Sequence, residues 1–441
     1  MTYDTPQIAV APDLSSGLPS LVESKTARFS AAIILYFLQG VPIGLGLIAI
    51  PAWLAANGAT PVQVGAFAGT SFLPWSLKLV NGLIMDRFAF KPMGRRRGWI
   101  LLAQILMTLV LIALAVLAPG PQDIALLTAL VFTLNVCATF NDVAVDGMVV
   151  DIVPEDERPL LNSLMFAAQG TGLAAVGFVG GVLLADGSIT RAALVFAAFV
   201  AVASTFVALF RERPGERLLP WTTGRASREC IERQQGAMWP IITGVARATF
   251  KRLTILFLVA VGLAMGTGAF IDAVASTLSV QQLGWASEEY SSFASAASLG
   301  GSLGAVLCAA PAVKAFGLRN ALFGAFSLHI TLGLIGGLTY PYWENDLIFM
   351  GLFCVQFMTH MLTLTFACVW FMHLSDPKVA ASQFALLNAA PTLMRSFYSG
   401  NSGFVIEWGG YQAVYLAISA LAALGLVAVV LAKVENKRSA E

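Results

Sequence analysis

Ionisable side chains occur inside otherwise apolar stretches of this chain, where a charge is costly unless it is paired. Lys78 lies in one such stretch, and Asp142 and Asp146 lie four residues apart in another. Counting about eight residues at 1.5 Å each places Lys78 and Asp142 both roughly 12 Å from the ends of their helices. A pair between Lys78 and either Asp142 or Asp146 would satisfy both charges. It would be a proton relay or a static buried salt bridge.

A second set of charges follows directly after Lys78. Asp86 closes the same apolar stretch, and a basic cluster that includes Arg95 and Arg96 comes next. The Asp86 carboxylate can accept charge-assisted hydrogen bonds from a guanidinium or from the open amides of a neighbouring helix start. Because such contacts can be made and broken, these three residues are predicted to act as a gate. The alternative is that the arginines only hold this loop in the cytoplasm.

A polar stripe near the C-terminus predicts a site for a solute. Its members recur at spacings of three or four residues and are Asn388, Thr392, Arg395, Ser399 and Ser402. A guanidinium forks onto carboxylate or phosphate, so Arg395 is predicted to bind an anionic substrate or a carboxylate on a facing helix. Asp272 has no basic residue near it in sequence, which suggests a water-lined site or a proton acceptor. We assign Arg395, Asn388, Gln39 and Asp272 to substrate binding. For His360 a hydrogen bond to a neighbouring helix is predicted, and the alternative is a group that titrates near neutral pH.

These residues are carried by membrane-spanning helices. Of the 441 residues, 57% are hydrophobic and 12% charged, which indicates an all-α membrane protein with many spans. We predict roughly twelve spans, near 29–56, 62–85, 99–118, 123–149, 160–185, 190–210, 251–282, 288–309, 319–339, 346–373, 379–406 and 411–433. When Lys and Arg are assigned to the connections between these spans, one side of the membrane holds only Arg191. Because Lys and Arg collect on the cytoplasmic side, the opposite side, which carries both termini, is expected to be the cytoplasmic one.

The spans divide into two similar halves. The predicted organisation is a cytoplasmic tail (1–28), a six-helix bundle (29–210), a polar linker (211–250), a second six-helix bundle (251–433) and a second tail (434–441). A weak repeat relates the turn at Thr60 to that at Ala286, and Thr60 with Gln63 has the spacing of a capping box. Glycine-rich first helices in both halves indicate a transporter site between the halves, or else close helix packing.

Other kinds of site find no support in the sequence. The five cysteines lack C-x-x-C spacing and the three histidines lie on different segments, so neither a disulfide framework nor a metal site is predicted. The sequence predicts neither a nucleophile elbow on a strand-to-helix turn nor a phosphate loop, so we expect no enzyme activity, no cofactor and no nucleic-acid partner. The expected partners are a small-molecule substrate, protons and the lipid bilayer.

Three motifs together resemble a known family. They are LPWSLKLVNGLIMDR (73–87) with GRRRGW (94–99), NDVAVD (141–146) with PEDER (154–158), and SQFALL (382–387) with Arg395. These are similar to motifs of the peptide/acetyl-coenzyme-A/drug transporter branch of the major facilitator superfamily, which includes AmpG-type muropeptide permeases and siderophore importers. The resemblance spans nearly the whole chain and implies a twelve-helix alternating-access fold with secondary transport, usually proton-coupled. It also puts Lys78, Asp86, Asp142, Asp146 and Arg395 at motif positions. Many AmpG-type permeases have two further helices, for which this chain has no room.

The leading hypothesis is therefore a monomeric secondary active transporter of the bacterial inner membrane. It would take up a bulky polar or anionic solute, such as an anhydromuropeptide, together with protons. A siderophore importer is an alternative within transport. A sensor or an assembly factor on the same fold is an alternative outside it, although a scaffold has no need of paired charges within the membrane.

Overall fold

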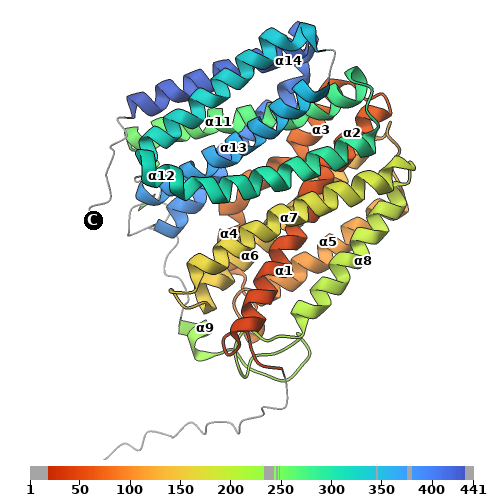
Figure 1. Cartoon of the computed structure of the whole chain (residues 1–441). Coiled ribbons are helices and arrows are strands. Elements are labelled where there is room, and N and C mark those ends of the chain that lie inside the picture. The colour runs from red at the N-terminus through yellow and green to blue at the C-terminus, as the bar shows by residue number, and fades with distance from the viewer. Residues whose placement is uncertain are drawn as a thin grey trace, which may run out of the picture.

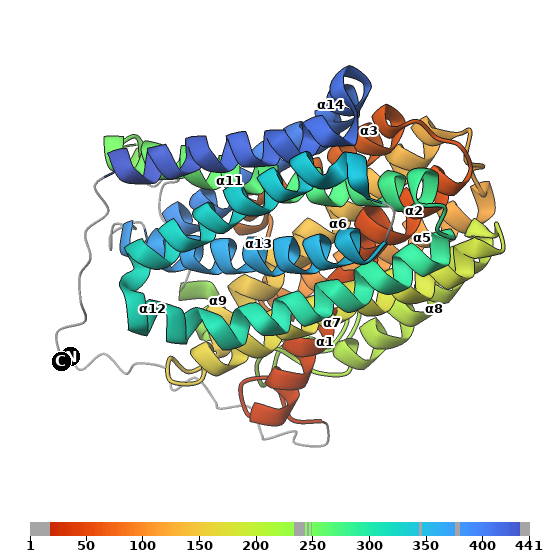
Figure 2. The same cartoon turned by 45° about the horizontal axis from the view of Figure 1, so that its top comes forward.

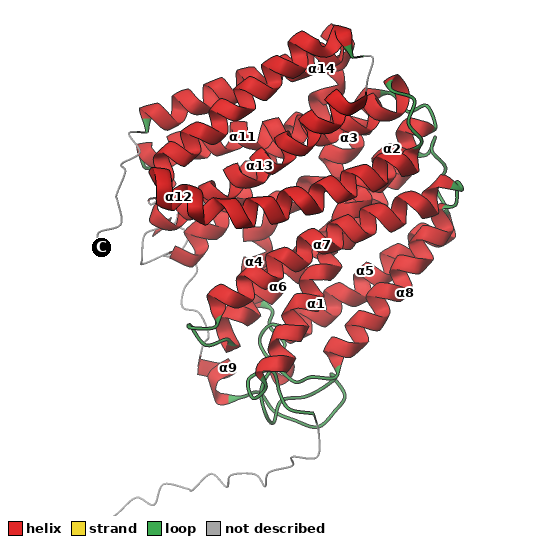
Figure 3. Cartoon of the chain, viewed as in Figure 1, coloured by secondary structure: helices red, strands yellow, loops and turns green. Residues whose placement is uncertain are grey.

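The computed structural model describes residues 18–232, 243–244, 247, 249–343, 346–374 and 380–432. Throughout that part of the chain the regular elements are helices (Figure 3). The predicted tail 434–441, most of the tail 1–28 and residues 233–242 of the predicted linker lie outside the described residues.

The first half contains α1 (Lys25–Gly44), η1 (Leu45–Ala49), α2 (Ile50–Ala56), α3 (Pro61–Phe72), η2 (Leu73–Leu77), α4 (Lys78–Arg87), η3 (Lys91–Met93), α5 (Arg97–Leu117), α6 (Ile124–Ile152), α7 (Arg158–Ala185) and α8 (Ile189–Ala208). The second half follows the short helix α9 (Arg228–Glu232). It contains α11 (Arg252–Thr277), η4 (Leu278–Gln282), α12 (Ser287–Thr339), η5 (Tyr340–Tyr342), α13 (Asp346–Leu374) and α14 (Ala380–Leu431).

Among the described residues, nine helices are long and apolar enough to cross a membrane. Two of them contain a break: α12 is non-helical at Gly317, and α14 is non-helical at Gly409 and Gly410. These glycines lie in the turns predicted between the spans 288–309 and 319–339 and between 379–406 and 411–433. The all-helical membrane fold is thus as expected, whereas the count of twelve and the side of the termini stay predictions.

The predicted span 62–85 differs from a single helix. It begins as α3 with the expected capping box, in which Thr60 Oγ1 accepts from Gln63 N and Thr60 N donates to Gln63 Oε1. It then passes through the 3₁₀ turns of η2 before α4 begins. Pro74 accounts for the change, because proline has no N–H for the bond to the carbonyl four residues earlier.

The helices form two bundles (Figures 1 and 2). In Figure 1, α1 and α4 to α8 lie together below, and α11 to α14 lie together above. The bundles meet near α2 and α3 and diverge toward the end that carries α9. Close packing of small residues makes the contact: a Cβ on Gly69 of α3 would lie 2.5 Å from the Ser396 carbonyl oxygen of α14. A hydrogen bond joins the halves at the same end, from Gln281 Nε2 to the Ala59 carbonyl oxygen at 2.8 Å.

Candidate functional site

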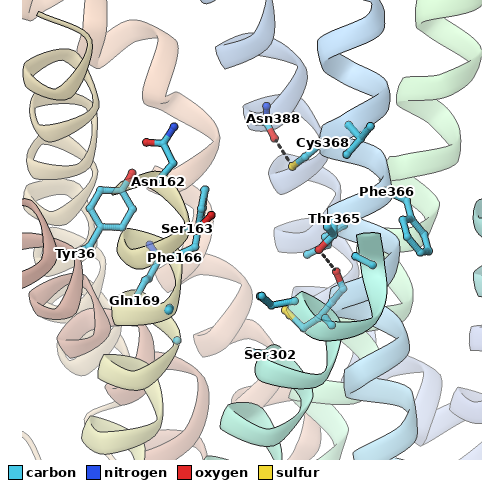
Figure 4. Close-up of a pocket in the computed structure, with 18 of the residues that line it drawn as sticks. Tyr36, Asn162, Ser163, Phe166, Gln169, Ser302, Thr365, Phe366, Cys368 and Asn388 are labelled. Carbon is cyan, nitrogen blue, oxygen red and sulfur yellow. Dashed lines mark hydrogen bonds between the residues drawn. The ribbon is translucent and has the colours of Figure 1, made fainter. Parts of the chain in front are cut away.

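A cavity of about 3100 Å³ lies between the two halves. Figure 4 shows Tyr36, Asn162, Ser163, Phe166 and Gln169 on one wall, facing Ser302, Thr365, Cys368 and Asn388 on the other. The lining extends to Arg95, Arg158 and Lys314 at the Lys- and Arg-rich end, whereas the halves are in contact at the opposite end. The volume exceeds the roughly 300–1,000 Å³ of pockets for drug-sized ligands, so a bulky solute fits with water around it.

The structure brings Lys78 and the α6 carboxylates together in this cavity. Lys78 Nζ lies 2.6 Å from Asp142 Oδ2, and the Asp142 side chain is only 3% exposed. Asp146 lies one helical turn further along and accepts a hydrogen bond from the Tyr36 hydroxyl of α1. Of the two pairs left open by the sequence, the one with Asp142 is therefore formed. Two carboxylates thus line the cavity, the buried Asp142 held by an ammonium group and the exposed Asp146 by a phenol.

Arg395 and Asp272 form the second ion pair of the cavity. Arg395 Nη2 bonds to Asp272 Oδ2, and both side chains are mostly buried. Asp272 has no basic residue near it in sequence, and the partner that it has in the structure lies 123 residues away. Of the two ligands predicted for Arg395, the carboxylate on a facing helix is the one present. Any anion that binds Arg395 at this place competes with Asp272.

Of the other two residues assigned to substrate binding, Asn388 lies on the cavity wall and Gln39 lies behind it. Asn388 lines the cavity and accepts a hydrogen bond from Cys368 Sγ at 3.4 Å. Gln39 is fully buried and accepts a hydrogen bond from Gln169 Nε2 at 2.5 Å. Gln169 lines the cavity in front of it, so the structure does not place Gln39 on the cavity wall. The cause is tight packing of α1 against α7 around Gly40, where even a Cβ would overlap the α7 backbone.

The predicted gate residues form one charged cluster. Asp86 Oδ1 lies 2.9 Å from Arg95 Nη2 and 2.8 Å from Arg96 Nη2, and all three side chains are mostly buried. Arg96 Nε also lies 3.8 Å from Asp151 Oδ2 at the end of α6. The Asp86 carboxylate is therefore bound by guanidinium groups from the following loop. All four residues line the cavity at its Lys- and Arg-rich end.

His360 does not have the predicted interhelical hydrogen bond. Its ring is 3% exposed, and neither ring nitrogen has a hydrogen-bond partner among the described residues. Gly268 of α11 packs against the ring face, and the ring of His329 lies 6.4 Å away. His360 thus belongs to the packed core behind the cavity wall.

Part of the predicted linker is folded against the loop that carries Arg95 and Arg96. This contact was not predicted from the sequence. Glu212 is fully buried, and its carboxylate accepts from Arg213 Nη1 at 2.8 Å and from the amides of Arg96 and Arg97 at 3.3 Å. Burial raises the pKa of Glu212. Burial, followed by the charge of nearby Glu212, raises the pKa of Glu216 to about 7. The alternation of Arg and Glu at 211–213 was the only sequence signal for this structure.

A cavity with ion pairs in both walls, enclosed between two bundles of membrane-spanning helices, is the general plan of a solute transporter. The chain belongs to the Major Facilitator Superfamily, because the model of that family matches residues 32–399. The protein is therefore a multi-pass membrane transporter of the major facilitator type.

Comparison with individual proteins points to permeases. The chain is 28% identical over 162 residues to the anhydromuropeptide permease of Escherichia coli (strain K12), a match that covers 36% of this chain and 30% of that permease. It is 23% identical over 444 residues to a putative transporter, AmpG 4, of Rickettsia felis, covering 91% of this chain and 95% of that protein.

Solved transporter structures share the fold. The nucleoside transporter NupG superposes with a TM-score of 0.67 at 13% identity, covering 92% of this chain and 100% of that one. A D-xylose-proton symporter gives a TM-score of 0.67 at 14% identity, covering 92% and 97%. At these identities the likeness concerns the fold alone.

Proposed function

We propose that this protein imports a bulky anionic solute, an anhydromuropeptide, across the bacterial inner membrane together with protons. The substrate class follows the relative that is an anhydromuropeptide permease, and the size of the cavity agrees with it. In this proposal the cavity is open to the cytoplasm, where both termini lie, and the protein acts as a monomer.

The observation that carries the coupling is the ion pair between Arg395 and Asp272 in the cavity wall. The permanently charged guanidinium is the natural ligand of a substrate carboxylate or phosphate, but Asp272 already occupies it. A proton on Asp272 removes the competing charge and frees Arg395 for the anion. Binding one anion therefore requires taking up one proton, which is the relation a symporter needs.

The charges of the whole cavity agree with this scheme. Among the described residues, six basic and six acidic ones line it, namely Lys78, Arg95, Arg96, Arg158, Lys314 and Arg395, and Asp86, Asp142, Asp146, Asp151, Glu155 and Asp272. Because formal charges balance, an added anion is uncompensated unless a carboxylate is protonated at the same time. In the first half, Lys78, Asp142 and Asp146 are proposed to relay the proton, and Asp86 with Arg95 and Arg96 to form the cytoplasmic gate.

Uptake into proteoliposomes tests the proposal and its alternatives. Purified protein is supplied with anhydromuropeptides, ferric siderophores or coenzyme A esters, with and without an inward proton gradient. We expect an anhydromuropeptide to accumulate only with the gradient. Accumulation of the siderophore instead would support the second transport hypothesis. Failure of the whole panel to bind or move would favour a sensor or an assembly factor.

A further inference from the structure

Three side chains of the segment 72–78 lie in one column. Phe72, Trp75 and Lys78 are spaced by three residues, and η2 between them is a 3₁₀ helix, in which residues i and i+3 eclipse. The rings of Phe72 and Trp75 are stacked with centroids 5.6 Å apart and planes 15° apart. Lys78 Nζ lies 4.7 Å from the centre of the Trp75 ring.

The second half of the protein supplies the other end of this column. Arg395 of α14 lies over the Phe72 ring, with Cζ 4.8 Å from its centroid. Each ring of this stacked pair therefore carries one cation, Lys78 at Trp75 and Arg395 at Phe72. Each cation is also held by a carboxylate, Asp142 or Asp272, from its own half. The column thus joins the two ion pairs of the cavity across the interface between the halves.

The local backbone makes the column. In an α-helix, side chains three residues apart are rotated by about 60°, so the same residues would not stack. Pro74 prevents that geometry because its nitrogen cannot donate the α-helical bond to Thr70. Trp75 is fixed from the other side by a 2.7 Å hydrogen bond from Nε1 to Asn135 Oδ1, about two turns along α6 from Asp142.

We propose that the Phe72–Trp75 stack is a positioning element that couples the Arg395–Asp272 pair to the Lys78–Asp142 pair. When Asp272 releases Arg395, the cation over Phe72 moves. Because the two rings are in contact, the change reaches Trp75 and the ammonium group on its other side. This inference rests on the proposed function for its role in transport, but its geometry can be tested without any substrate.

The test is ¹⁹F NMR of the full-length protein labelled with 5-fluorotryptophan. The Trp75 resonance is identified as the one missing from Trp75→Phe. We expect Asp272→Asn, which frees Arg395, to shift this resonance. In a Phe72→Leu background the same substitution should leave this resonance nearly in place, because the ring that lies between Arg395 and Trp75 is gone.

Two control backgrounds separate coupling from general disturbance. Leu77→Ala changes a residue of the same turn that lies off the column and is 48% exposed, so the full shift should remain. Phe72→Tyr keeps the ring and should also keep the shift. Phe72→Met, which fills similar volume without a ring, takes the place of Phe72→Leu should that variant fail to fold.

Two results would overturn the inference. One is a Trp75 shift on Asp272→Asn that is equally large without the Phe72 ring, and the other is the absence of any shift in the otherwise unchanged protein. Neither result depends on uptake. An inactive transporter with a normal shift would contradict the proposed function and leave the coupling intact.

Discussion

The Asp272→Asn substitution tests the competition between the internal carboxylate and the substrate anion. Asparagine keeps the shape of the side chain but removes the charge that holds Arg395 in the cavity wall. In the unmodified protein, binding of one anion requires one proton on Asp272. Apparent affinity should therefore fall about tenfold for each pH unit once Asp272 is ionised. In Asp272→Asn the guanidinium is free at every pH, so this dependence should disappear and binding at alkaline pH should be tighter.

Calorimetric titration of the purified protein with an anhydromuropeptide, repeated across neutral pH, measures this slope. Asp186→Asn is the matched control, since Asp186 pairs with Arg191 at 3.0 Å on the exposed surface outside the cavity. It should retain the full slope. A tenfold change per pH unit that persists in Asp272→Asn would refute the competition, because the proton would then bind elsewhere.

Four further predictions concern the other charged groups. Arg395→Lys keeps the positive charge but loses the two parallel hydrogen bonds of the guanidinium, so affinity for the anion should weaken about ten- to a hundredfold, or about 1.4 to 3 kcal/mol. If amidation of the substrate's anionic group weakens binding equally in the unmodified protein and in Arg395→Lys, Arg395 does not bind that group. Asp142→Asn or Asp146→Asn should abolish accumulation against a gradient while exchange remains measurable, and a variant that still concentrates substrate removes that residue from the relay. Asp86→Asn should leave the protein folded but shift its conformational equilibrium, measured as changed cysteine accessibility on both faces; unchanged accessibility counts against a gate. In the folded state Glu216 holds a proton that the unfolded state releases, so the linker segment should lose stability as pH rises from the ordinary carboxyl range to about 7. Glu216→Gln should remove this pH dependence, measured by hydrogen exchange corrected for its intrinsic rate. An unchanged pH dependence in the variant would assign it to another group.

Arguments of helix depth and spacing anticipated one wall of the site. Lys78 was predicted to pair with Asp142 or Asp146 because Lys78 and Asp142 lie equally far from the ends of their helices, and the pair with Asp142 is formed at 2.6 Å. The spacing of Thr60 and Gln63 predicted the capping box that begins α3. Such features are local, or depend only on the rise of a helix, so the sequence contains them.

The remaining features depend on how helices pack, which spacing does not reveal. Arg395 meets Asp272 because α14 crosses α11, and the two residues are 123 positions apart. Gln169 covers Gln39 because α1 and α7 approach closely at Gly40. The 3₁₀ turn was foreseeable from Pro74, but the apolar run around it favoured one continuous helix. The folded part of the linker depends on the burial of Glu212, whereas its polar composition predicted only a linker between the two bundles.

Proton movement driven by the substrate itself tests the central claim most directly. Proteoliposomes that contain a trapped pH-sensitive dye are given an external anhydromuropeptide, with equal pH on both sides at the start. We expect the lumen to acidify as the anion enters, and Arg395→Lys to slow both fluxes together. Entry of the anion at an unchanged internal pH would contradict proton coupling through this cavity.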